Sequence, residues 1–129
     1  MEESSSAKEK KEFVIGNRAE ELFECVIQIC DPKNKHCTFP AYLRDEIGGE
    51  MIRAARETLK SALFANGSRG DERTAYQRQS YNNIVYLNFL CRTSYNNGWI
   101  TEKQHDRIIR YTEELTRRIY NWKRSGGNV

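Results

Sequence analysis

The residue types most often found at the centre of a chemical site are scarce in this chain, and most of them are thiols. The 129 residues include four cysteines and two histidines, and Cys30, His36 and Cys37 lie close together in the sequence. Structural zinc sites usually take a CxxC pair of cysteines and a second pair of ligands further along the chain. Because this spacing is missing, we expect neither a bound metal nor another cofactor.

The same residues do not form a recognisable catalytic pattern. His36 falls in a predicted loop beside Cys37, and His105 falls in the first turn of the last predicted helix. Neither HExxH nor GxSxG occurs, and no ordered Ser, His and Asp triad is evident. We therefore predict that the protein is not an enzyme and assign no catalytic residue. One alternative stays open, a thiol enzyme, which would require a reactive Cys37.

The charged residues point to a different chemistry, the binding of phosphate groups. On a helical projection of residues 101–123, most cations fall on one side of the apolar stripe and most acids on the other. Residues 42–65 carry a similar basic ridge. Such segregation builds a local positive field even at a net charge of only +3, and positive fields attract phosphate backbones. The residues predicted to contact nucleic acid or a polymerase are Arg53, Arg56, Lys60, Lys103, Arg107, Arg110, Arg117, Arg118, Lys123 and Arg124.

The charge pattern also has a simpler interpretation, which the sequence leaves open. Opposite charges on a solvated helix face commonly form ion pairs within the chain. Glu114 interrupts the basic band of the last helix, and Glu50 lies beside Arg53 on the earlier one. Arg44 projects toward the apolar side of that earlier helix, where it is either a charge between subunits or a side chain with only its stem buried.

Apolar side chains also lie outside the main stripes of the third and fourth predicted helices. A helix that is apolar on most sides has to be covered on more than one side, and in a short chain a second subunit is the natural cover. Aromatic residues among arginines can also stack on nucleobases, but stripes on helices more often pack against protein. We therefore predict a homo-oligomer whose interface contains Tyr81, Val85, Tyr86, Phe89, Ile109 and Tyr120.

Four predicted helices would position these side chains. Apolar residues recur every three or four positions over residues 13–30, 42–65, 71–95 and 101–123. The connections between these segments are short, so neighbouring helices should be antiparallel, and no segment alternates as a strand does. We predict an all-α fold, an antiparallel up-down-up-down four-helix bundle.

Local signals indicate where the helices begin and end. Asp31-Pro32 should end the first helix, because proline disfavours helical geometry in the residue before it. Thr101 and Gln104 have the spacing of a capping box at the start of the last helix. The adjacent Gly48 and Gly49 predict a kink or a close backbone contact within the second helix.

The composition is typical of one small soluble domain. Hydrophobic residues make up 38% and charged residues 30%, and no apolar run is long enough for a membrane span or a secretion signal. We expect a cytoplasmic protein with reduced cysteines and no membrane partner. The predicted organisation is a disordered charged tail at 1–11, the four-helix bundle at 12–124 and a frayed C-terminus at 125–129.

Several landmarks occur in an order that matches a known family. They are Phe39-Pro40, then Leu87 and Leu90, then the GWITEKQ hinge at residues 98–104 and the late Trp122-Lys123. In these features the chain resembles the four-helix-bundle superfamily that includes ribosomal-RNA intervening-sequence proteins and the accessory variability determinant of diversity-generating retroelements. The hinge and the late Trp-Lys are more similar to the accessory determinant, and the resemblance covers roughly residues 13–124.

The resemblance implies a small basic bundle that assembles into a ring-shaped homopentamer. It implies binding to the retroelement reverse transcriptase and to nucleic acid, with the preference between RNA and DNA left open, in support of mutagenic copying of a template RNA into cDNA. This chain departs from the family in being less basic, which favours a role as a scaffold for the polymerase. The rival hypothesis is an intervening-sequence-type structural oligomer with no nucleic-acid role.

Overall fold

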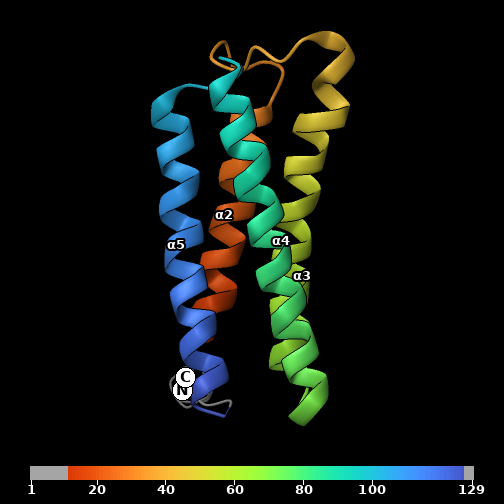
Figure 1. The fold of residues 1–129 in the computed structure, drawn as a ribbon, viewed down its shortest axis with the longest axis vertical. Helices are drawn as coiled ribbons and strands as arrows, with labels where there is room; N and C mark the ends of the chain where they lie inside the picture. Colours follow the sequence, from red (N-terminus) through yellow and green to blue (C-terminus); the bar gives the residue numbers. More distant parts are fainter. Residues whose placement is uncertain (1–11, 127–129) are drawn as a thin grey trace, which may run out of the picture.

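The computed structural model describes residues 12–126 as four long α-helices. They are α2 (Val14–Cys30), α3 (Gly49–Asn66), α4 (Gly70–Asn96) and α5 (Glu102–Arg124). Consecutive helices run in opposite directions, and α2 packs against both α3 and α5 while α4 closes the other side (Figure 1). The predicted all-α, up-down-up-down bundle is confirmed, and the described part of the chain contains no strand.

The predicted tail at residues 1–11 lies outside the described residues, as do residues 127–129 of the predicted frayed C-terminus. Ser125 and Gly126 are described and follow α5 as a turn. No described helix is both long and apolar enough to cross a lipid bilayer.

The core forms where the apolar stripes of the four helices meet. Branched residues such as Leu22 and Ile108 are fully buried, and Trp122 is only 1% exposed. On α3 the buried side chains are mostly small, as the alanines at 54 and 55 illustrate, so α4 can approach closely. The contact includes a hydrogen bond in which Ser80 Oγ donates to the Thr58 carbonyl at 2.8 Å. Small buried residues thus bring α3 and α4 close enough for side chain-to-backbone bonding.

The second predicted helix is present, but it is built in three pieces. A short 3₁₀ turn (Ala41–Leu43) leads into a π-helical segment (Arg44–Gly48), and α3 begins only after it. The irregular part ends at the Gly48-Gly49 pair. Because glycine has no side chain, the backbone there tolerates a change of hydrogen-bond pattern. The predicted irregularity is therefore confirmed, and it extends further toward the N-terminus than the sequence indicated.

At one end of the bundle, the connection between α2 and α3 contacts the connection between α4 and α5. The backbone N–H of Thr38 donates to the Trp99 carbonyl at 2.9 Å, and the Phe39 and Trp99 rings lie 5.7 Å apart. The predicted capping box is formed, since Gln104 N–H donates to Thr101 Oγ1 and Thr101 N–H donates to the Gln104 side chain. These bonds set the position of α5 relative to its neighbours.

Candidate functional site

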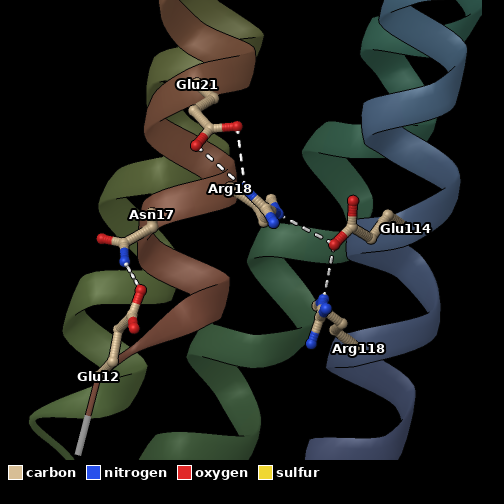
Figure 2. Close-up of polar contacts among 6 residues, drawn as sticks. All are labelled: Glu12, Asn17, Arg18, Glu21, Glu114 and Arg118. Atoms are coloured by element: carbon tan, nitrogen blue, oxygen red, sulfur yellow. Dashed lines mark hydrogen bonds and ion pairs between the residues drawn. The ribbon is translucent and has the colours of Figure 1, made fainter.

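The flank of α5 that faces α2 is closed by ion pairs, here called the α2–α5 seam. Arg18 Nε on α2 donates to Glu114 Oε2 at 3.1 Å, and Arg118 Nε donates to the same oxygen at 2.8 Å (Figure 2). Arg18 also pairs with Glu21 one turn away. Hydrogen bonds from Arg118 and then Arg18 lower the pKa of Glu114. Glu114, which interrupts the predicted basic band, therefore neutralises part of the charge of that band. Arg118, a member of the band, is paired within the chain.

A second pair removes Arg53 from the predicted ridge on α3. Two of its guanidinium nitrogens donate to the Glu50 carboxylate, at 2.8 and 3.0 Å. Glu50 also accepts a hydrogen bond from the Tyr86 hydroxyl at 3.0 Å, and both donors lower its pKa, Arg53 the more. The interpretation as a solvated face with internal ion pairs therefore holds for Arg53 and Arg118.

Other predicted contact residues remain open to solvent. Lys103, Arg107 and Arg110, here called the outer α5 band, are exposed and form no ion pair with a described carboxylate. The exposed cations elsewhere in the predicted set that likewise make no ion pair within residues 12–126 are Arg56, Lys60, Arg117, Lys123 and Arg124. Two of these contact aromatic rings, because Lys60 lies 5.8 Å from Phe64 and Arg124 lies 5.8 Å from Tyr120.

The predicted interface residues lie on α4 and α5, and their surroundings differ. Tyr86 points toward α3 and is 40% exposed, whereas Ile109 is half-buried. Val85 and Phe89 are 50% and 60% exposed on α4. The two residues are four positions apart on α4, so their side chains lie on the same side of that helix.

A groove that the sequence did not predict runs between α4 and α5. It has a volume of about 500 Å³, which is within the range of ligand pockets. Asn88 lines the groove, while its carboxamide oxygen is buried beneath the surface and has no hydrogen-bond partner among the described residues. The residues that line this α4–α5 groove are Tyr81, Asn88, Thr112, Glu113, Thr116, Arg117, Ile119, Tyr120 and Lys123.

Sequence reasoning missed Asn88 because a polar residue on a long helix ordinarily faces water. The available signal was its place on α4, between apolar positions on both sides. Arg44 is a comparable case, since its Nε is buried without a partner in the described part of the protein. Both atoms are unusual, because buried polar groups are normally hydrogen-bonded.

The thiols lie inside the bundle. All four cysteines are free and buried. Burial raises the pKa of Cys30 and of Cys91 to about 12, and it also raises that of Cys37. A raised pKa leaves little thiolate at neutral pH, which disfavours the thiol-enzyme alternative. Within residues 12–126, no group of three ligating side chains is placed to hold a metal ion.

Comparison of the chain with protein-family models, with curated proteins and with solved structures found no match.

Proposed function

We propose that the protein is a non-enzymatic accessory protein of a diversity-generating retroelement. It binds the reverse transcriptase and the template RNA or its cDNA, and it supports mutagenic reverse transcription as a ring-shaped homo-oligomer. The observation that carries the proposal is the outer α5 band, in which Lys103, Arg107 and Arg110 face solvent without a described acidic partner. The resemblance in the GWITEKQ hinge supplies the identity of the partners.

Unpaired surface cations suit a phosphate backbone. Binding of a cation to a phosphate releases condensed counterions, so affinity falls as salt rises and does not depend on sequence. Contacts of this kind position a protein on nucleic acid without reading its bases. Arg53 and Arg118 are less available for this role than the unpaired cations, because an external phosphate would compete with Glu50 or Glu114 for them.

Self-association would bring several copies of the outer α5 band into one assembly. Val85 and Phe89 on α4 are exposed apolar side chains, and their burial against a second copy supports assembly. The resemblance sets the expected number of copies at five. In a ring, each copy adds one outer α5 band, so the local positive field grows while the charge of each chain stays small.

The salt dependence of RNA binding tests the proposal. The double variant Arg107→Glu and Arg110→Glu should bind a single-stranded RNA more weakly in fluorescence anisotropy. Loss of two phosphate contacts should reduce the slope of log K against log salt by about 1.4. The matched control is Lys33→Glu with Lys35→Glu, which changes the net charge equally in an exposed loop. Equal binding by both double variants would refute the outer α5 band as the contact surface.

A second candidate function is a structural oligomer without a nucleic-acid role. The internal pairing of Arg53 and Arg118 favours it, because part of the predicted basic surface is neutralised within the chain. A flat salt slope for the unmodified protein would select this function.

A further inference from the structure

The outer side of α4 is apolar at its centre and basic toward both ends. Val85 and Phe89 are exposed at the centre. Arg78 lies seven residues before Val85 and Arg92 seven residues after it, a spacing of about two helical turns, so these side chains share one side of the helix. Both arginines are exposed, and neither forms an ion pair with a described carboxylate. The α4 face is defined here as Arg78, Val85, Phe89 and Arg92.

The outer side of α2 carries the opposite charge. Glu20 and Glu24 are exposed about one turn apart, and neither pairs with a cation of residues 12–126. Ile27, three residues further on, is an exposed apolar side chain. The sequence of α2 contains a single cation, Arg18, and it pairs across the α2–α5 seam with Glu114. The α2 face is defined here as Glu20, Glu24 and Ile27.

The two faces point away from the bundle in opposite directions. Helices α2 and α4 each pack against both α3 and α5, so they occupy opposite corners of the bundle, with α4 in front and α2 behind it in Figure 1. One chain therefore cannot place its own α2 face against its own α4 face. A second copy of the chain can, and the contact would then join an acidic surface to a basic one.

A symmetric contact between two α4 faces fits the charges less well. Around a two-fold axis at Val85, antiparallel α4 helices would place Arg78 of one copy opposite Arg92 of the other, because both arginines are seven residues from the axis. Like charges in this position repel. No acidic residue follows Glu72 in the sequence of α4, so the helix cannot neutralise the two arginines itself.

A nucleic acid would suit only one of the two faces. Its phosphates are attracted to Arg78 and Arg92, but they repel the acidic α2 face and leave it uncovered. A second copy satisfies both faces at once, because opposite charges meet around exposed apolar side chains. Charge complementarity therefore favours another copy of this chain as the partner of the α4 face.

We propose that copies of the chain assemble head to tail, with the acidic α2 face of one copy against the basic and apolar α4 face of the next. A contact between two different faces leaves one face of each kind free at the ends, so it is completed only in a closed ring or an open filament. This inference rests on the proposed function, which supplies the closed ring. It adds which surfaces form each contact, and these surfaces contain no residue of the outer α5 band.

Reversal of the charge on each face tests the contact by sedimentation equilibrium. The unmodified chain should sediment as an oligomer at micromolar concentration. Arg78→Glu with Arg92→Glu reverses the α4 face, and Glu20→Lys with Glu24→Lys reverses the α2 face. Each double variant should raise the dissociation constant of the oligomer about tenfold or more, because like charges then face each other.

Each double variant has a matched control with the same change in net charge outside both faces. Lys33→Glu with Lys35→Glu matches the α4-face variant, and Asp45→Lys with Glu46→Lys matches the α2-face variant, since all four residues are exposed. Neither control should change the oligomer mass. Circular dichroism shows that every variant retains its helices.

The variant that combines both reversals distinguishes the head-to-tail contact from a symmetric one. Its two faces have exchanged charges, so they attract each other again and the oligomer mass should return. A symmetric contact between α4 faces would stay repulsive in this variant. An equimolar mixture of the two double variants should also regain mass, because each copy then meets a face of opposite charge. The mixture keeps the test valid should the combined variant fail to fold.

The remaining outcomes separate this inference from the proposed function. If both double variants keep the oligomer mass, the head-to-tail contact is wrong and the ring of the proposed function stands. If the unmodified chain is a monomer that binds RNA with a steep salt slope, the assembly is wrong and the nucleic-acid role stands. If reversal of the α4 face weakens RNA binding without changing the mass, that face contacts nucleic acid and the inference is overturned.

Discussion

Both flanks of α5 carry charged residues, and they differ in whether the chain pairs those charges within itself. In the α2–α5 seam, Arg18 and Arg118 both donate to Glu114. In the α4–α5 groove, Asn88 Oδ1 is buried without a described partner, and Arg117 forms no ion pair with any described carboxylate. The seam is thus a contact completed within one chain, whereas the groove is left open to an external group. Arg118 is therefore engaged within the chain, whereas Arg117 on the same helix is available to an external anion.

The largest effect on stability should come from disrupting the buried side of α5, which lies between its two flanks. The centres of the Trp122 ring on α5 and the Phe13 ring are 5.4 Å apart, and the Arg73 guanidinium of α4 lies over the Trp122 ring, 5.5 Å from its centre. Trp122→Ala should lower the free energy of unfolding by about 3–5 kcal/mol, because it removes a large buried side chain. Urea denaturation followed by circular dichroism measures this. A loss no greater than that of an exposed residue such as Tyr120→Ala would contradict the packing described.

The seam should make the stability of the protein depend on pH. The pKa of Glu114 and that of Glu50 are lowered in the folded protein from an ordinary value of 4.5. A carboxylate with a depressed folded pKa stabilises the fold above its unfolded pKa, and this contribution disappears as the pH falls through the folded value. Thermal unfolding should therefore show a constant contribution from these groups near neutral pH and a decline below about pH 4.5. A melting temperature that rises on acidification through this range would exclude the pairing.

A single neutralising change should sharpen the contrast between the flanks. Glu114→Gln removes the charge that Arg18 and Arg118 share, so it should lower the melting temperature modestly and weaken the acid dependence. Because the freed arginines become available, RNA affinity should rise slightly at low salt. Glu113→Gln is the matched control, since Glu113 faces the groove and forms no ion pair with a described cation. Equal effects of the two variants would remove the distinction between paired and open flanks.

The smallest effect on stability is expected in the groove. Asn88→Leu replaces a buried acceptor that has no described donor, so the folded state loses no hydrogen bond to that oxygen from the described residues. The free energy of unfolding should stay the same or rise by up to about 1 kcal/mol. A destabilisation as large as that of Glu114→Gln would mean that Asn88 already has a structural role.

The fold was predictable because its determinants are local. The stripe containing Leu22 and Val26 is buried as its spacing predicted, and the capping box at Thr101 and Gln104 is formed. The π-helical segment before Gly49 was not predicted in detail, since periodicity and propensity describe only the regular helix.

The candidate site was predictable only in part. The sequence placed Arg107 and Arg110 in a basic band on one side of the apolar stripe of the last helix, and the structure leaves both exposed and without an ion pair to a described acid. The same reasoning could not separate them from Arg118, which is paired, and it did not find Asn88. Spacing along one helix predicts which side a residue occupies but not what the neighbouring helix places opposite it.

Local sequence patterns are sufficient to specify that four amphipathic helices form and which side of each is apolar, because both properties depend on residues within a few positions of one another. Which charges are neutralised and where a groove opens depend instead on how the helices pack. Those outcomes depend on the rotation and the register of packed helices, which bring Arg18 to Glu114 from opposite ends of the chain and leave Asn88 Oδ1 without a described donor.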